Sequence, residues 1–201
     1  GLSKNYIEAY FDTYKETEMA LKPSIIAPGN KTVTDGCILG NIVFSKNTVI
    51  VSGPSTEVNK VTSVTAETSI SAPLTATTTV TPELKLVGAA ADELSNVSIL
   101  EGDTAITMTM PVLKLVELPT TVTFRNAPAN YLDGNMNFSV SPSRISAAVP
   151  VEKVDQITSL SVGSIDFSEL DAGLNTLNFK ASDITDFMIT DQSIKNFKVS
   201  V

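Results

Sequence analysis

The chain has 201 residues and a net charge of −8, from 14 Lys and Arg against 22 Asp and Glu. This acidic balance leaves no basic stripe of the kind that nucleic-acid phosphates require, which argues against direct binding to DNA, RNA or an anionic membrane. The sequence contains no His, and this removes the usual general base, the Ser-His triad and most zinc sites.

The first part of the chain is predicted to consist of strands separated by turns. Residues 5–18 alternate loosely, which fits a strand or a short amphipathic helix and favours the strand. Residues 19–26 continue as an extended segment, in which Pro23 indicates an edge or a bend. Asp35-Gly36 is a turn dipeptide, and residues 37–44 after it are predicted to be strand.

A short helix is predicted after each of two prolines. Val58, Val61 and Val64 recur at every third residue, so they would share one face of a helix of about ten residues. The corresponding stripe in the second half of the chain is Val151, Val154, Ile157 and Leu160. A helix this short is marginal alone, so packing of the stripe on a sheet is expected to hold it.

The remaining segments are predicted to be strands and single helical turns. The predicted strands are residues 64–70, 75–81, 84–86 and 106–110, and in the second half 160–167, 177–179 and 197–201. Residues 84–86 are matched with 177–179, and the Thr-rich residues 75–81 are interpreted as an exposed strand face. Single helical turns are predicted at 92–94 and 183–185.

The same pattern occurs twice in the chain. Placing Pro54 over Pro150 gives a shift of 150 − 54 = 96 residues, and the same shift places Val58 over Val154. A repeat of this kind determines the architecture before any single residue is interpreted.

The sequence therefore predicts an all-β fold with short helices, arranged as two tandem β-rich repeats. Residues 19–112 form the first repeat and residues 113–201 the second, and residues 1–18 are a leading segment that could be the end of a preceding repeat. Residues 113–119 join the two copies. They are apolar and not rich in Gly or Ser, which predicts an extended and stiff junction.

Few residues suggest chemistry. Cys37 is the only cysteine, so no intrachain disulfide or cysteine-cluster zinc site can form, and without a His to activate it the thiol is interpreted as structural or incidental. Two acidic clusters contain the oxygen ligands that calcium prefers: Asp166, Glu169 and Asp171, and Asp183, Asp186 and Asp191. Turns and caps explain both clusters without a metal, so we predict no catalytic, cofactor-binding or metal-binding residue and no cofactor.

Several short motifs follow one another in the same order in both copies. The first copy has VSGP at residues 51–54 and VNKVTSV at 58–64, and the second has VDQITSL at 154–160, IDFS at 165–168 and Ala172-Gly173. This order resembles the YbbR-like domain, whose repeats run through a VxGP-like turn, a VxxIxSV-type helix, a DLS-like strand start and a Gly-containing turn. Two departures occur: residues 69–71 read SIS in place of the DLS-like piece, and residues 148–150 read AVP where Gly-Pro is usual.

The resemblance implies β-rich repeats with intertwined hairpins, located outside the membrane of Gram-positive-type bacteria behind an N-terminal transmembrane helix. Some members regulate a membrane diadenylate cyclase and so set cyclic di-AMP levels. No stretch here approaches the roughly 20 apolar residues of a membrane span, so the anchor is expected outside these residues.

We therefore expect a non-enzymatic, extracytoplasmic protein-interaction module, with a membrane diadenylate cyclase as the suspected partner. Two alternatives remain open: a structural spacer or surface adhesin module of the cell envelope, and a carbohydrate- or calcium-binding module.

Overall fold

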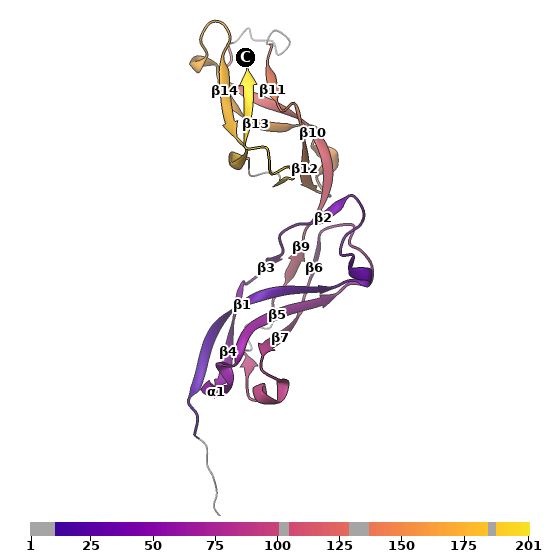
Figure 1. The fold of residues 1–201 in the computed structure, drawn as a ribbon, viewed down its shortest axis with the longest axis vertical. Coiled ribbons are helices and arrows are strands. Elements are labelled where there is room, and N and C mark those ends of the chain that lie inside the picture. The colour runs from indigo at the N-terminus through magenta and orange to yellow at the C-terminus, as the bar shows by residue number, and fades with distance from the viewer. Residues whose placement is uncertain (1–10, 101–104, 129–136, 185–187) are drawn as a thin grey trace, which may run out of the picture. The chain divides into compact units, whose positions relative to one another are not determined.

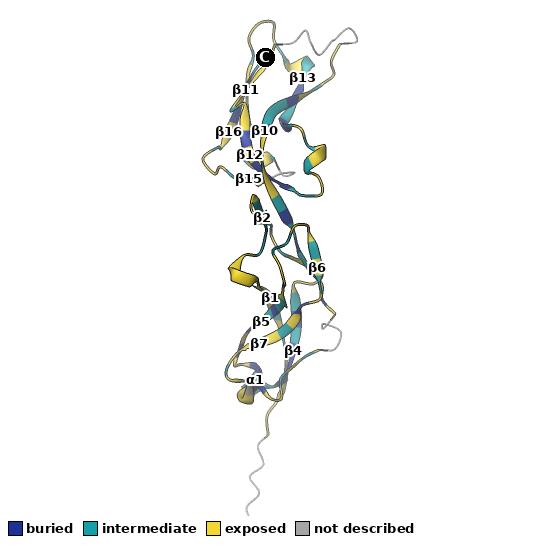
Figure 2. Cartoon of the chain, turned by 90° about the vertical axis from the view of Figure 1, so that its right-hand side faces the viewer, coloured by how far each residue is buried: buried dark blue, intermediate teal, exposed yellow. Residues whose placement is uncertain are grey.

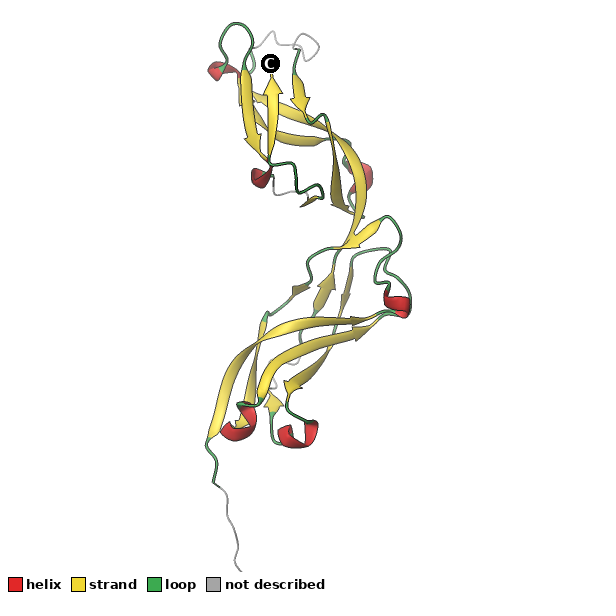
Figure 3. Ribbon diagram, in the orientation of Figure 1, coloured by secondary structure: helices red, strands yellow, loops and turns green. Residues whose placement is uncertain are grey.

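The structure is a computed structural model that describes residues 11–100, 105–128, 137–184 and 188–201. Strands dominate it and the helices are short, which confirms the predicted all-β fold (Figure 3). The strands of the first half are β1 (Tyr14–Ile26), β2 (Cys37–Leu39), β3 (Val43–Phe44), β4 (Thr48–Pro54), β5 (Val61–Ser69), β6 (Thr78–Val80), β7 (Glu83–Gly88), β8 (Ser98–Ile99) and β9 (Met108–Met110). Those of the second half are β10 (Val112–Arg125), β11 (Ser139–Ser141), β12 (Arg144–Pro150), β13 (Leu160–Asp166), β14 (Thr176–Lys180), β15 (Met188–Ile189) and β16 (Asn196–Ser200). The helical elements are α1 (Ser55–Val58) and the 3-10 turns η1 (Pro28–Asn30), η2 (Ala91–Leu94), η5 (Val154–Gln156), η6 (Phe167–Glu169) and η7 (Ala181–Asp183).

The chain folds as two units whose boundaries interleave in the sequence. The first unit comprises the chain up to Thr32, Asn41–Pro73 and Thr78–Met110. The second comprises Val33–Gly40, Leu74–Thr77 and Pro111–Val201. The second unit therefore includes two short segments of the first sequence copy, which the predicted division after residue 112 did not anticipate.

In the first unit β1 is the central strand of a sheet with the order β7-β5-β1-β4-β8 (Figure 1). Its residues 14–20 pair antiparallel with β4, and its residues 21–26 pair parallel with β5 on the other side. Pro23 lies beyond the end of the β4 pairing and has one neighbouring strand, β5, among the described residues, which agrees with the predicted edge position. β1 begins at Tyr14, so the last residues of the predicted leading segment are part of this central strand.

The second unit repeats this arrangement around β10, which pairs antiparallel with β12 and parallel with β13. Met19 pairs with Val49 in the first unit and Leu118 pairs with Ile145 in the second. The shifts are 118 − 19 = 99 on the central strand and 145 − 49 = 96 on its partner. The shift of 96 residues found in the sequence thus also relates β4 to β12 in the two sheets.

A smaller sheet also occurs in both units, with the order β3-β9-β6 in the first and β11-β16-β14 in the second. Val80 pairs with Met108, and Leu177 pairs with Val199, so the shift between β6 and β14 is 177 − 80 = 97. The predicted match of residues 84–86 with 177–179 was therefore wrong. Residues 84–86 and 177–179 both alternate between apolar and polar side chains. Only the strands with which they pair distinguish the two segments.

Among the described residues of the second unit, no strand corresponds to β7. Ala91 begins η2 and Ala181 begins η7, a shift of 181 − 91 = 90, whereas the shift at β6 is 97. The second copy therefore lacks 97 − 90 = 7 residues in the stretch that forms β7 in the first copy.

The two predicted helices are much shorter in the structure. α1 ends at Val58 and β5 begins at Val61, so Val61 and Val64 are strand residues. The pairing of β5 shifts register between Val61 and Ser63, and this irregularity brings two buried valines to a spacing of three residues. In the second copy the helical element is η5 alone and β13 begins at Leu160, so no continuous helix carries that stripe.

Each unit has its own apolar core, visible as dark blue segments in Figure 2. The buried residues of the first core are Leu21, Val49, Val51, Val61, Val64, Leu94 and Ile106. The second core is larger and includes Leu118, Leu160, Val162, Phe197 and Val199. Residues 113–119, predicted to be an extended junction, are extended and form part of β10 at this core.

Candidate interaction surfaces

One carboxylate of each acidic cluster accepts hydrogen bonds within a turn. The carboxylate of Asp166 accepts hydrogen bonds from the amide and hydroxyl of Ser168, and Asp191 accepts the same pair from Ser193. These bonds lower the pKa of both carboxyl groups. No group of three His, Cys, Asp or Glu suited to a metal occurs among the described residues, and Asp186 lies outside them.

Cys37 occupies a structural position. It is half-buried at the start of β2, where it lies opposite Lys114 of β10. Its backbone N–H donates to the carbonyl of Thr34 at 3.2 Å, which closes the turn before the strand. The residue therefore lies within a paired strand, consistent with the interpretation of the thiol as structural or incidental.

Two open hollows occur in the described parts of the chain. One of about 530 Å³ lies in the second unit between η7, β15 and the segment leading into β16, and its walls mix Lys180, Asp191 and Lys195 with aliphatic side chains. The other, of about 290 Å³, lies on β1 and β4 beside Glu16 and Glu18. Both hollows are open to solvent, whereas a typical small-molecule site encloses most of its ligand.

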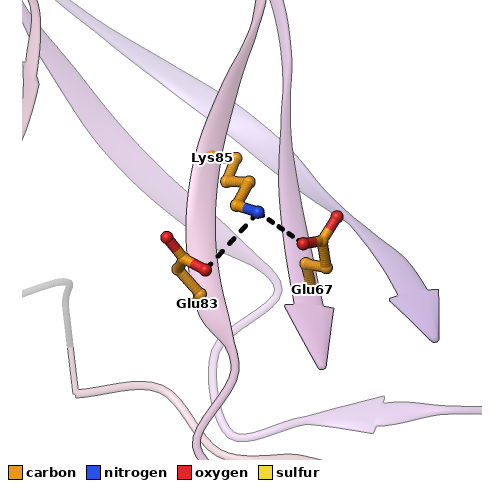
Figure 4. A network of polar contacts seen from close by, with 3 residues as sticks. All are labelled: Glu67, Glu83 and Lys85. Atoms are coloured by element: carbon orange, nitrogen blue, oxygen red, sulfur yellow. Dashed lines mark hydrogen bonds and ion pairs between the residues drawn. The ribbon is translucent and has the colours of Figure 1, made fainter. Parts of the chain in front are cut away.

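The outer edge of β7 is charged. Lys85 of this strand lies between Glu67 of β5 and Glu83 of β7, with 3.4 Å between its Nζ and Oε2 of Glu83 (Figure 4). The hydrogen bond to Glu67 raises the pKa of Lys85. Charged side chains along an edge strand disfavour pairing with another strand, so this edge is a poor docking surface.

The start of β1 differs from the charged edge of β7, because it exposes large apolar side chains to solvent. Phe11 is 97% exposed and Tyr14 is 70% exposed. The intervening Asp12 ties this segment to α1, because its carboxylate accepts from the hydroxyl of Ser55 at 2.7 Å and from the amide of Thr56 at 3.0 Å. These hydrogen bonds hold the pKa of Asp12 far below its usual range.

The same segment has an open sheet edge. Residues 14–20 pair with β4 on one side, and β5 begins to pair only at Leu21 on the other. Within the described ranges, no strand covers residues 14–20 on the side away from β4. An uncovered edge beside exposed apolar side chains suits an extended segment of another protein. This surface was not predicted from the sequence, although the repeat offered a signal, because Tyr14 aligns with Leu113 on the second central strand.

Comparison with known proteins gives two matches. Residues 27–109 match the sequence model of the family described as YbbR-like protein. A crystal structure of a YbbR-like protein from Streptococcus pneumoniae TIGR4 is similar over 96% of this chain and 97% of that chain, with 14% sequence identity and a TM-score of 0.46. None of the curated proteins compared with the sequence matches it.

Proposed function

We propose that the chain is a non-enzymatic protein-interaction module, because residues 27–109 match the sequence model of the YbbR-like family. In this proposal it belongs to the extracytoplasmic part of a membrane-anchored regulator of a diadenylate cyclase, and so acts in cyclic di-AMP signalling. The family match supports the proposal, because the resemblance of the repeats implies this location and this partner.

One structural feature supports an interaction role. The described residues present an open sheet edge beside Tyr14, which suits pairing with an extended segment of another protein. The net charge of −8 disfavours nucleic acid as the partner.

The proposal places the membrane anchor outside these residues. The helices that the structure describes are all too short or too polar to cross a bilayer. A test of the function must therefore supply an anchor to hold the module beside a membrane enzyme.

The experiment joins the chain to a heterologous transmembrane helix and co-expresses it with the diadenylate cyclase of the same organism. Co-purification of the two proteins and the cellular level of cyclic di-AMP are both measured. A matched control carries Val64→Asp, which buries a charge at a fully buried core position and removes the fold while the anchor stays the same.

Association together with a changed cyclic di-AMP level, both lost in the Val64→Asp control, is the expected result. A folded, anchored module that neither binds the cyclase nor changes the nucleotide level would overturn the proposal. That outcome would leave the spacer or adhesin role as the better explanation of a tandem repeat with no partner enzyme.

A further inference from the structure

The second unit shows how the start of its central strand is covered. β2 pairs antiparallel with β10, with Leu39 opposite Val112, Ile38 opposite Leu113 and Cys37 opposite Lys114. Backbone hydrogen bonds extend this pairing at both ends, from Gly40 N–H to the Pro111 carbonyl at 2.8 Å and from Leu115 N–H to the Gly36 carbonyl at 2.9 Å. Here a segment of the first sequence copy covers the edge opposite β12.

The first unit has the same edge, and no strand of its described residues covers it. The shift of 99 residues places Leu113 over Tyr14 (113 − 99 = 14) and Lys114 over Lys15 (114 − 99 = 15). The N–H and C=O of Thr13 face β4, because its carbonyl accepts from Ser55 N–H, so those of Tyr14 face the open side. Val112 is fully buried, whereas its equivalent Thr13 is exposed.

We propose that residues 13–16 of β1 are a docking edge for the β2-type strand of another module of this fold. The incoming strand would pair antiparallel, as Cys37–Leu39 pairs with β10. This occupant is inferred because it is the one that the molecule itself shows on the equivalent edge. The proposal does not depend on the proposed function, since it concerns contact between modules of one kind.

The side chains on the edge suit such a strand. In the register of the second unit, Tyr14 would lie opposite the residue equivalent to Ile38, an aromatic side chain against a β-branched one, which is a favourable cross-strand pair. Docking would also cover part of the Tyr14 ring, which is 70% exposed in the first unit.

One contact of the second unit cannot be reproduced. There Glu152 accepts a hydrogen bond from Thr77 N–H at 2.8 Å, which fastens a second segment of the first copy. The equivalent of Glu152 is Thr56 (152 − 96 = 56), whose own N–H donates to Asp12. Strand pairing alone must therefore hold the incoming module, so docking is expected to need the high local concentration that a covalent tether provides.

The test is a tandem protein with an added copy of residues 11–110 joined to Asp12 of the full chain. Met110 of the added copy then takes the place of Phe11, because 110 − 99 = 11. The full chain carries Lys15→Cys, so that its new thiol would face Cys37 of the added copy, and its own Cys37 is replaced by Ser. Cross-links formed under mild oxidation are located by peptide mapping.

The geometry of the register favours this cross-link. Leu115 with Gly36 and Pro111 with Gly40 are hydrogen-bonded pairs, so the Lys114–Cys37 pair alternates with them as a non-hydrogen-bonded pair. The Cα atoms of such pairs lie about 4.5 Å apart, within the span of a disulfide. Lys114→Cys in the unaltered chain is therefore the positive control, and Glu18→Cys in the tandem protein is the matched control outside the register.

The expected result is a disulfide between position 15 and Cys37 of the added copy, at a rate comparable with that of Lys114→Cys, and loss of the cross-link with Glu18→Cys. Equal cross-linking at positions 15 and 18, or none at 15 while Lys114→Cys reacts, would overturn the proposal. Amide exchange serves as the second measurement. Protection of Val49 in the added copy establishes that it has folded, and gained protection of Tyr14 is required by the proposal.

Discussion

Gly163 should not tolerate a methyl group while Phe179 is present. A Cβ atom on Gly163 would overlap the edge of the Phe179 ring and lie 3.1 Å from its Cγ. The ring packs against the core of the second unit, so it cannot move inward without disturbing that core. Overpacking of this kind costs about 1–3 kcal/mol, so Gly163→Ala should lower the stability of the second unit by that amount.

The group that a methyl on Gly163 would meet is the Phe179 side chain and not the backbone. A smaller residue at position 179 should therefore restore the stability that Gly163→Ala removes. Phe179→Leu alone should cost less than about 1.5 kcal/mol, because the residue is half-buried and stays apolar. In the Phe179→Leu background, Gly163→Ala should cost less than about 0.5 kcal/mol. The double-mutant cycle should therefore give a coupling energy of about 0.5–3 kcal/mol, in the range of residues in direct contact.

The assay is urea unfolding of the four proteins followed by far-UV circular dichroism, with amide exchange along β13 to assign the change to the second unit. For a unit of this size each 1 kcal/mol corresponds to roughly 4–8 °C in Tm, so thermal unfolding offers an independent check. Strict additivity of the two substitutions would refute the reasoning, because it would mean that the ring does not occupy the space above Gly163.

Three further predictions concern single side chains. Asp12 has a depressed pKa in the folded protein, so its contribution to stability is present above the unfolded pKa of about 4 and is lost as the pH falls through the folded pKa. Asp12→Asn should therefore remove this acid dependence from the curve of Tm against pH. Lys85 makes exposed ion pairs, so Lys85→Gln should leave Tm within experimental error, and a clear loss would contradict its assignment as a surface charge. Leu160 is fully buried and Leu174 is 83% exposed, so Leu160→Ala should cost about 2–5 kcal/mol in urea unfolding while Leu174→Ala is close to neutral.

The repeat was the part of the fold that the sequence predicted best. Pro54 and Pro150 align at a shift of 96, and the same shift relates β4 to β12 in the paired sheets. The two-residue periodicity also predicted the strands that close each copy, β9 and β16. Buried and less buried residues alternate along both strands, and Met108 and Val199 are fully buried. These features were predictable because burial of one strand face leaves a direct trace in the order of residue types.

The predicted helices were longer than the observed ones for an identifiable physical reason. A spacing of three residues between Val58, Val61 and Val64 fits a helix face, yet a register irregularity in a strand produces the same spacing. The β-branched residues from Val61 onward favour the strand, and α1 is a single turn. Short apolar runs do not separate the two cases, since periodicity alone cannot decide between a brief helix and a bulged strand.

The candidate surface could not be predicted from any motif, because it is defined by what is missing beside a strand. Tyr14 alone is an ordinary strand residue, and it becomes informative only when compared with Leu113 of the second copy. That comparison needs the 99-residue shift on the central strand, which differs from the 96-residue shift visible in the sequence. The exposed edge is thus a property of pairing and not of composition.

The missing β7 gives the second unit an edge that must be managed in another way. With no strand beyond it in the described parts of the unit, β13 ends its sheet, and open edges invite pairing with other chains. The β10–β13 register shifts across residues 161–164, the hydroxyl of Ser161 donates to the Gly163 carbonyl at 3.2 Å, and the Phe179 ring lies against Gly163. A bulge, a satisfied carbonyl and an aromatic cover each make the edge a poorer template for a strand. The ring that excludes a methyl group at Gly163 therefore also protects β13, and Phe179→Ala should make the second unit more prone to self-association as well as less stable.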